Sequence, residues 1–313
     1  MKAAVVTSFD QPPRYADFAD PVADGRGALQ LEVLAAPVHH LTMARATGRH
    51  YSSRATLPLV PGVDGVGRDP DGKLRYFVLD DTPFGSFAER TVIDPKRSLV
   101  LPRGCDPVTI AAAMNPAMAA WLALRRRVPF RKKQQVLILG ATGNAGTMAV
   151  QIARLLGASR IIAAGRNEQR LQPLPALGAT DVVPLDDPRI GELAREVDVV
   201  LDFVWGEVGA RILDRVVRSR ADRTRVLTWI QIGAMAGSTA PIPADLLRAT
   251  RLQIVGSGIG SVPGRAIVAE LPALAREIAR GRLRIDARAI PLHEVERAWR
   301  EAAASPERIV LTP

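Results

Sequence analysis

The chain has little cysteine, few aromatic residues and no long apolar run. Among its 313 residues there is one cysteine, Cys105, so no internal disulfide and no four-cysteine zinc cluster can form. Aromatic residues make up 4% of the sequence, and no stretch approaches the roughly 20 apolar residues that span a bilayer. These absences exclude a disulfide-stapled module and predict that no membrane is involved.

Charge is abundant but dispersed. The formal net charge is +10, and the arginines are spread over the whole chain rather than gathered in one basic helix. With so few aromatic residues and no recognisable binding module, we expect no nucleic-acid partner and interpret the basic surface as favouring a polyanionic cofactor. The first residues predict a short strand rather than a secretory signal, so we expect a cytoplasmic protein.

The pattern of apolar residues changes along the chain. Residues 1 to about 110 contain short β-branched runs broken by Pro and Gly, which is typical of a twisted, mostly antiparallel β domain. From about residue 134, apolar strands alternate with helix-length segments, which indicates a parallel sheet covered on both faces. The expected parallel strands are Val136–Leu139, Arg160–Ala164, Asp181–Val183, Val197–Phe203, Arg225–Ile232 and Leu252–Val255. Six strands match a doubly wound dinucleotide-binding fold, so the predicted class is α/β.

The tail after Val262 has a mixed pattern. It predicts a helix over Arg265–Arg280, a short strand near Ile285, a second helix over Val295–Ala303 and a closing strand over Arg308–Leu311. We expect this tail to return to the first domain. The predicted organisation is therefore a Rossmann domain over residues 116–262 and a β-rich domain built from residues 1–115 and 263–313.

A glycine-rich turn stands between a strand and a helix. Gly140-Ala-Thr-Gly-Asn-Ala-Gly146 follows the apolar strand Val136–Leu139 and precedes a helical pattern over Thr147–Leu156. Missing side chains at such a place allow a tight turn, close approach of a pyrophosphate and close helix packing. The alternative is a tight turn in an α/β protein that binds no nucleotide. We predict dinucleotide binding through Gly140, Thr142, Gly143, Asn144, Ala145 and Gly146.

The residues after the second expected strand indicate which dinucleotide is bound. An acidic residue about 20 positions on from the glycines usually binds the ribose 2′-hydroxyl of NAD. This chain has Gly165-Arg-Asn167 there, and the guanidinium of Arg166 is suited to a 2′-phosphate, with Arg170 as a second contact. The alternative is that Arg166 is a solvent-facing residue at a helix start. We predict NADPH rather than NADH, held in part by Gly165, Arg166, Asn167 and Arg170.

Several further segments occur in a specific order along nearly the whole sequence. They are Leu57–Gly67, Phe84–Glu89, Asn115–Trp121, Ala149–Ala153, Leu177–Asp181, Asp198–Asp202 and Pro291–Glu296. With the glycine turn, they resemble the medium-chain dehydrogenase/reductase superfamily, in its zinc-free quinone-oxidoreductase-like branch. The resemblance implies a Rossmann domain beside a β-rich, GroES-like catalytic domain. It also implies hydride transfer from NADPH to a quinone or an α,β-unsaturated carbonyl in the cleft between them, and a homodimer with Thr224–Ser261 as a sheet-edge contact.

Two segments depart from the patterns of this superfamily. Zinc-containing relatives hold the metal through a Cys near positions 39–42 and a His after a Pro-Gly pair, whereas this chain has His39-His-Leu-Thr42, and Val63 after Pro61-Gly62. Adjacent histidines on a strand point to opposite faces, so we expect no metal site. Zinc-free relatives show Asn-Pro-x-Asp at 39–42, so this departure leaves the hydride acceptor and its stereochemistry open. Gly67–Arg75 also lacks the usual valine-rich strand, which implies a trimmed barrel.

Two residues are candidates for the chemistry at the acceptor. Reduction of an enone needs a held nicotinamide, a donor to the developing enolate oxygen and a proton source. Tyr51 is the candidate donor because it lies near the place where the family has a pocket aromatic; the alternative is a rim aromatic with its hydroxyl in water. His39 is a candidate proton donor or ribose contact, and the alternative is a structural histidine.

Further cofactor contacts are expected from residues near strand ends. Asn115 is expected to reach the nicotinamide, or alternatively to start a helix. Gly233 and Ser257 follow strands whose carboxyl ends should face the ligand, and Trp205 is expected near the cofactor or in the core. The whole pattern predicts a zinc-free, NADPH-dependent oxidoreductase. The alternatives are an NADPH-binding or sensing protein with little turnover, and an alcohol dehydrogenase.

Overall fold

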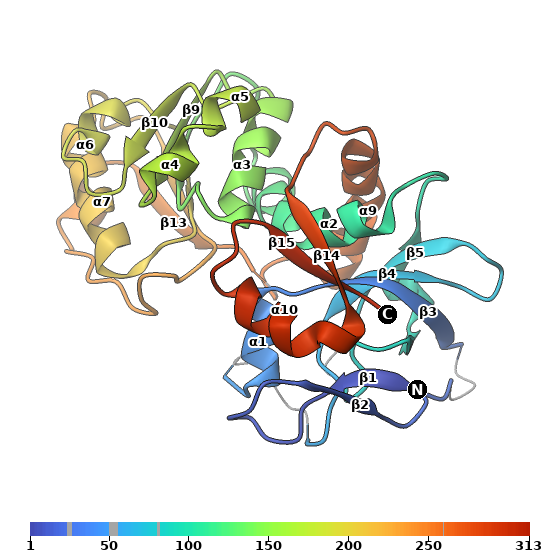
Figure 1. The fold of residues 1–313 in the computed structure, drawn as a ribbon. Coiled ribbons are helices and arrows are strands. Elements are labelled where there is room, and N and C mark those ends of the chain that lie inside the picture. The colour runs from blue at the N-terminus through green and yellow to red at the C-terminus, as the bar shows by residue number, and fades with distance from the viewer. Residues whose placement is uncertain (24–26, 50–55, 80–81, 259) are drawn as a thin grey trace. The chain divides into compact units, whose positions relative to one another are not determined.

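The protein consists of two compact units. The computed structural model describes residues 1–23, 27–49, 56–79, 82–258 and 260–313. The first unit contains Met1–Asn115 and Val268–Pro313, and the second contains Pro116–Ile267 (Figure 1). The later boundary falls inside helix α9 (Gly264–Ala279), whereas the expected boundary stood just before that helix.

The first unit is built on a mostly antiparallel sheet of the order β14-β15-β3-β4-β5-β7, with β6 paired to β3. The bounds of its strands are β3 (Leu29–Pro37), β4 (Asp64–Arg68), β5 (Leu74–Val78), β6 (Arg90–Ile93), β7 (Ser98–Val100), β14 (Ala287–Pro291) and β15 (Arg308–Thr312). The tail strand β15 pairs antiparallel with β3 and parallel with β14. A separate hairpin joins β1 (Lys2–Val5) to β2 (Arg14–Asp17). The strand predicted near Ile285 begins two residues later, because the chain first turns through Gly281, which has a positive φ of 68°.

The core of the first unit lies between the sheet and short helices. Phe77, Phe87 and Leu31 are buried, and they pack with Val295 and Ala298 of helix α10 (Val295–Ala302). Helix α1 (His40–Ala46) follows β3 directly, so its first residues are fixed by the end of that strand. Strands β4 and β5 form a tight hairpin, in which the carboxylate of Asp69 accepts hydrogen bonds from the Lys73 amide at 2.8 Å and Arg75 Nε at 2.7 Å.

The second unit contains a six-stranded sheet in the order β10-β9-β8-β11-β12-β13, all parallel. Its strands are β8 (Gln135–Leu139), β9 (Arg160–Gly165), β10 (Asp181–Pro184), β11 (Val199–Asp202), β12 (Leu227–Gln231) and β13 (Leu252–Gly256). Four consecutive residues of β8, Val136–Leu139, are completely buried, as a strand covered on both faces requires. This order is that of a doubly wound dinucleotide-binding sheet, and it confirms the predicted fold class.

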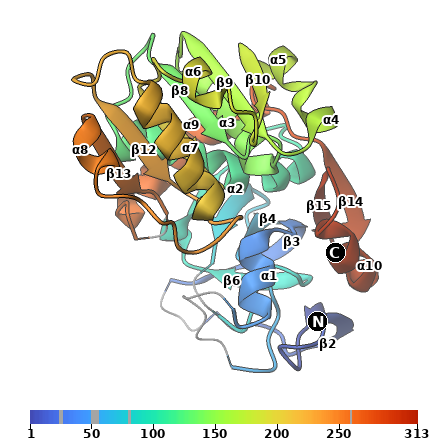
Figure 2. The ribbon, with the colours of Figure 1, turned by 90° about the vertical axis from the view of Figure 1, so that its left-hand side faces the viewer.

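Helices connect the parallel strands (Figure 2). They are α3 (Asn144–Leu155), α4 (Glu168–Leu171), α5 (Leu174–Leu177), α6 (Ile190–Leu193), α7 (Gly206–Ser219) and α8 (Leu246–Ala249). Helix α7 places Ile212, Leu213, Val216 and Val217 in a core cluster with β8, β9, β11 and β12. This apolar stripe recurs at the helical spacing, because residues three and four apart share one helix face.

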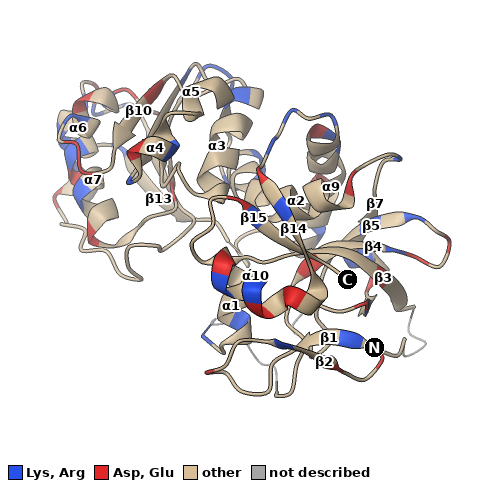
Figure 3. Ribbon diagram, viewed as in Figure 1, with Lys and Arg blue, Asp and Glu red and all other residues tan. Residues whose placement is uncertain are grey.

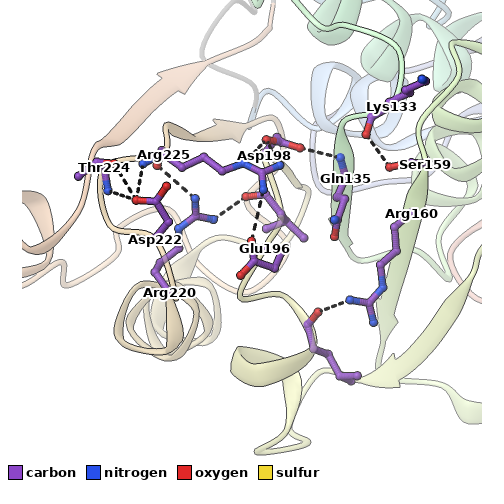
Figure 4. Close-up of polar contacts among 12 residues, drawn as sticks. Lys133, Gln135, Ser159, Arg160, Glu196, Asp198, Arg220, Asp222, Thr224 and Arg225 are labelled. Atoms are coloured by element: carbon purple, nitrogen blue, oxygen red, sulfur yellow. Dashed lines mark hydrogen bonds and ion pairs between the residues drawn. The ribbon is translucent and has the colours of Figure 1, made fainter.

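A network of charges joins the amino ends of these strands (Figure 4). The Asp198 carboxylate accepts hydrogen bonds from the Gln135 amide at 2.8 Å and from Arg225 Nε at 2.9 Å. Arg220 donates to the Val197 carbonyl at 2.6 Å, and burial lowers the pKa of its guanidinium. Elsewhere, Lys and Arg are distributed over both units rather than gathered on one element (Figure 3). Side chains of the protein thus bind one another at the amino edge of the sheet. Open α/β sheets bind ligands at the opposite, carboxyl edge.

One long apolar helix remains. Helix α2 (Pro107–Leu122) continues into a π-helical turn (Ala123–Arg127). By length and composition it is the one helix in the described part of the chain that is long and apolar enough to cross a membrane. Most of it is buried inside the protein, which is typical of a core helix and makes this weak evidence for a span.

Candidate functional site

The candidate site of the second unit lies where the strand order reverses. Strand β8 has β9 on one side and β11 on the other, so the segments that follow β8 and β11 diverge at the carboxyl edge. Open α/β sheets bind ligands in the crevice at such a point. The two segments are 140–146, called here the glycine turn, and 203–206, called the β11 loop. They lie against each other, since a Cβ on Gly140 would stand 3.3 Å from both Phe203 Cβ and Val204 Cγ2.

The glycine turn contains residues that are glycine for two different reasons. Gly140 has a positive φ of 85°, which disfavours any side chain, and a Cβ on Gly146 would lie 2.1 Å from the Gly140 carbonyl oxygen. Both positions are therefore required by the fold. Gly143 differs, because it has an ordinary φ of −86° and the nearest atom to an added Cβ is 3.6 Å away. The protein itself leaves room for a side chain at Gly143.

Helix α3 begins at this turn without a side-chain cap. Gly143 is its N-cap residue, no side chain among the described residues caps the first-turn amides, and the first turn carries no acidic residue. Asn144 and Ala145 are half-buried at its start. Uncapped amides at a helix N-terminus favour an anion, both through hydrogen bonds and through the helix dipole. The turn therefore has the local chemistry of a phosphate-binding site.

The end of β9 supplies the positive charge. Arg166 is exposed, and its guanidinium bonds to no residue in the described ranges. Asn167 caps helix α4, its side chain accepting a hydrogen bond from the Arg170 amide at 3.1 Å. Gly165 packs under the turn, since a Cβ there would come 2.4 Å from Thr142 Cγ2. Gly165 and Asn167 thus have structural reasons for their identity, and Arg166 has none within the protein.

The β11 loop is anchored by a buried carboxylate. Asp202 is fully buried at the end of β11, and its Oδ1 accepts hydrogen bonds from the amides of Val204 and Trp205, both at 2.8 Å. Its Oδ2 accepts one from Trp229 Nε1 at 2.9 Å. Burial raises the pKa of this carboxyl group, while the three N–H donors oppose that rise. Asp202 therefore fixes the path of the loop.

Three other predicted contact residues occupy different surroundings. Gly233 is required by packing, because a Cβ there would lie 2.7 Å from the Phe203 carbonyl oxygen. Ser257 is buried beyond β13, and its amide donates to the Gln231 carbonyl at 2.8 Å. Asn115 lies in the interior of α2, directly before Pro116. The alternative that Asn115 starts a helix is therefore wrong, because the helix begins at Pro107.

In the first unit, His39 belongs to a buried polar cluster. It is the N-cap residue of α1, and its Nδ1 accepts a long hydrogen bond of 3.4 Å from the Thr42 amide. Because Nδ1 accepts, Nε2 carries the proton and donates to Asp64 Oδ1 at 2.9 Å. Tyr76 donates its hydroxyl to Asp64 Oδ2 at 2.7 Å, and burial, together with the Asp64 charge, raises the pKa of Tyr76 well above its usual value. Both ring nitrogens of His39 thus have partners inside the first unit.

Arg308 of β15 completes this cluster with a buried positive charge. Its Nη1 donates to the Val38 carbonyl at 3.2 Å, and burial lowers its pKa to about 10. Burial, followed by the charge of Arg308, lowers the pKa of His40. Across the described ranges, no three His, Cys, Asp or Glu side chains come together. His39 and Asp64 bind each other instead, so the residues described do not fit a catalytic zinc ion, which needs three protein ligands.

The structure does not test every predicted residue, and it adds others. Tyr51, the candidate donor, lies outside the described residues. Asp64, Tyr76 and Asp202 were missed as site residues, although Asp64 and Asp202 lie in the segments Leu57–Gly67 and Asp198–Asp202 that carried the resemblance. The sequence signal for Asp64 and Asp202 was an acidic residue directly after an apolar one, Val63 and Leu201 respectively.

The sequence is similar to those of known dehydrogenases and reductases. A family model described as a zinc-binding dehydrogenase matches residues 145–280. An NADPH-dependent quinone reductase of Emericella nidulans is 29% identical, and the match covers 100% of both chains. A 2-methylene-furan-3-one reductase of Solanum lycopersicum is 26% identical over 58% of this chain and 51% of its own length.

A solved structure matches the whole chain. The quinone oxidoreductase of Thermus thermophilus, known also in complex with NADPH, has a TM-score of 0.84 and 28% identity, with 100% of each chain covered. Over its whole length the chain is therefore similar to quinone oxidoreductases of the medium-chain dehydrogenase/reductase superfamily.

Proposed function

We propose that this protein is an NADPH-dependent oxidoreductase that transfers hydride to a quinone or an α,β-unsaturated carbonyl without zinc. Gly143 is the observation that carries the cofactor part of the proposal. Neither its backbone conformation nor its neighbours require a glycine, and it stands at the uncapped start of α3. A missing side chain that the fold does not need is accounted for by a ligand that approaches the backbone there.

The second unit supplies binding and orientation. The uncapped amides of α3 bind the pyrophosphate, and the free guanidinium of Arg166 binds the 2′-phosphate, with Arg170 beside it. Contacts from Asn115, Gly233 and Ser257 to the nicotinamide half belong to the same proposal. When bound, NADPH supplies the hydride, and the protein controls its position and excludes competing reactions.

The first unit supplies the groups that act on the acceptor. Hydride addition to a quinone or enone leaves a negative charge on oxygen, and a hydrogen-bond donor that meets this charge lowers the barrier. We propose Tyr51 for this role. His39 is the second candidate, and because both its ring nitrogens have partners, we propose that it acts through the Asp64 cluster that holds it.

The same bonds of His39 favour a second candidate function. A histidine whose nitrogens are both engaged has no proton free for substrate, which suits a protein that binds NADPH and turns over slowly. We also propose a cytoplasmic homodimer. Strand β13 pairs only with β12 among the described strands, so its other edge is free for a second copy, within the region 224–261.

The first prediction concerns turnover. Purified protein should oxidise NADPH, followed by its absorbance, in the presence of at least one member of a panel of quinones and enones. Addition of a chelator should leave the rate unchanged. No oxidation above background, combined with tight NADPH binding in calorimetry, would favour the sensing function, and loss of activity on chelation would contradict the absence of zinc.

The second prediction separates the two kinds of glycine in the turn. Gly146→Ala should lower the free energy of unfolding by about 3 kcal/mol, because the new Cβ meets backbone that cannot move aside. Gly143→Ala should leave the unfolding midpoint in urea nearly unchanged and raise the dissociation constant of NADPH at least about tenfold. Equal NADPH affinity in Gly143→Ala and the wild type would show that no ligand approaches this residue.

The third prediction concerns the choice of cofactor. Arg166→Ala should weaken NADPH binding by about one to two orders of magnitude, which is the loss of a charged hydrogen bond, and leave NADH binding unchanged. Calorimetry with both cofactors measures this. Arg248→Ala, at an exposed arginine of α8, is the matched control for net charge. A preference for NADPH that persists in Arg166→Ala would place the selecting residue elsewhere.

The fourth prediction distinguishes Tyr51 from His39. Tyr51→Phe should lower kcat by about a hundredfold or more, the typical effect of losing one donor to a developing oxyanion, with little change in NADPH affinity. His39→Ala should lower the unfolding midpoint as well as kcat, since it removes the donor to Asp64 Oδ1. A fully active Tyr51→Phe would remove Tyr51 from the mechanism.

A further inference from the structure

Trp205 has a backbone conformation that its side chain disfavours. It is the N-cap residue of α7, with φ 53° and ψ −154°, and Gly206 follows at φ 64°. This combination lies beside a region that is populated almost only by glycine, because a Cβ crowds the neighbouring carbonyl there. Among the described residues other than glycine, only Lys133 also has a positive φ. The chain therefore carries its largest side chain at a position that suits glycine.

The surrounding structure holds this strained conformation in place. The Asp202 carboxylate accepts hydrogen bonds from both the Val204 and Trp205 amides. Helix α7 closes over the same carboxylate, since a Cβ on Gly209 would lie 3.1 Å from Asp202 Oδ2. On the far side, Gly206 packs so closely that its Cβ would meet the Ala236 carbonyl oxygen at 2.5 Å. Trp205 thus has no freedom to relax its backbone.

The fold alone does not account for an indole at this position. Trp205 is only half-buried and packs at the margin of the core cluster, where the fully buried Trp229 already fills the centre. Its neighbours Phe203 and Val204 lie against Gly140, so the loop that carries Trp205 lies beside the glycine turn at the reversal of strand order. Strain retained at a ligand-binding edge points to a functional use.

We propose that the indole of Trp205 forms the wall of the dinucleotide crevice opposite the glycine turn, and that Asp202 is the positioning residue that holds it there. The inference rests on the proposed NADPH binding and goes beyond it by assigning the second wall. An indole offers a flat apolar face and one N–H donor, which suit packing against a ring or ribose of the cofactor. A glycine at position 205 would relieve the backbone strain, but it would also remove the indole that forms this wall.

The test compares three substitutions of Trp205. Trp205→Ala and Trp205→Gly both remove the indole, and each should raise the dissociation constant of NADPH about tenfold in calorimetry, whereas Trp205→Phe should stay within about threefold. Glycine ordinarily destabilises a position relative to alanine. Here Trp205→Gly should unfold at a higher urea concentration than Trp205→Ala, because it removes the backbone strain.

Asp202 is tested through an effect that a merely structural role would not produce. Asp202→Ala removes the acceptor of both loop amides, so the KM for NADPH should rise severalfold while kcat at saturating NADPH is retained. Trp229→Phe is the matched control, since it removes one bond to the same carboxylate but leaves both loop amides bound. Its KM for NADPH should stay at the wild-type value.

The possible failures are distinguishable. A wild-type protein that does not bind NADPH would overturn the proposed function. Wild-type affinity retained in both Trp205→Ala and Trp205→Gly would overturn this inference and leave the proposed function standing. A Trp205→Gly protein less stable than Trp205→Ala would show that the strain is absent. If Asp202→Ala does not fold, the Trp205 series still decides the role of the indole.

Discussion

The reversal of strand order between β8 and β11 is the constraint on which the second unit depends. All six strands run parallel, so their carboxyl ends lie at one edge, and the chain leaves that edge in opposite directions on the two sides of the reversal. The glycine turn and the β11 loop are brought together there although about 60 residues separate them. A sheet of the same strands in simple sequential order would have no such crevice.

Close packing at this edge explains most of its glycines without any ligand. Gly146, Gly165, Gly206 and Gly233 each face backbone or side-chain atoms so near that a Cβ would collide. A glycine pattern alone therefore does not distinguish a binding turn from a tight turn. The distinction comes from Gly143, where the protein leaves space, and from Trp205, where it keeps a large side chain against backbone preference. Gly143 lies on the segment that follows β8 and Trp205 on the segment that follows β11, at the reversal of strand order.

The sequence was sufficient for the fold because its signals are local. Near-continuous apolar strands, the strand-turn-helix context of Gly140–Gly146 and the arginine at position 166 directly after a strand can each be read within a few residues. The His39 cluster could not be predicted in this way, since its partners Asp64 and Tyr76 lie 25 residues or more away and meet it only through the register of β3, β4 and β5. The conformation of Trp205 was hidden for the same reason, because it depends on the carboxylate that anchors the loop.

The buried cluster of the first unit explains why adjacent histidines need not indicate a metal. A carboxylate taken out of water must be bonded, and Asp64 meets this requirement with the Nε2 proton of His39, the hydroxyl of Tyr76 and the nearby charge of Arg308. The acceptor atoms that a zinc ion would require are thereby used within the protein. His40, at the first position of α1, has no place in that cluster, and burial together with the charge of Arg308 lowers its pKa. His39 and Asp64 are thus bonded to each other rather than open to a metal, and Tyr51 stays the residue proposed for the chemistry at the acceptor.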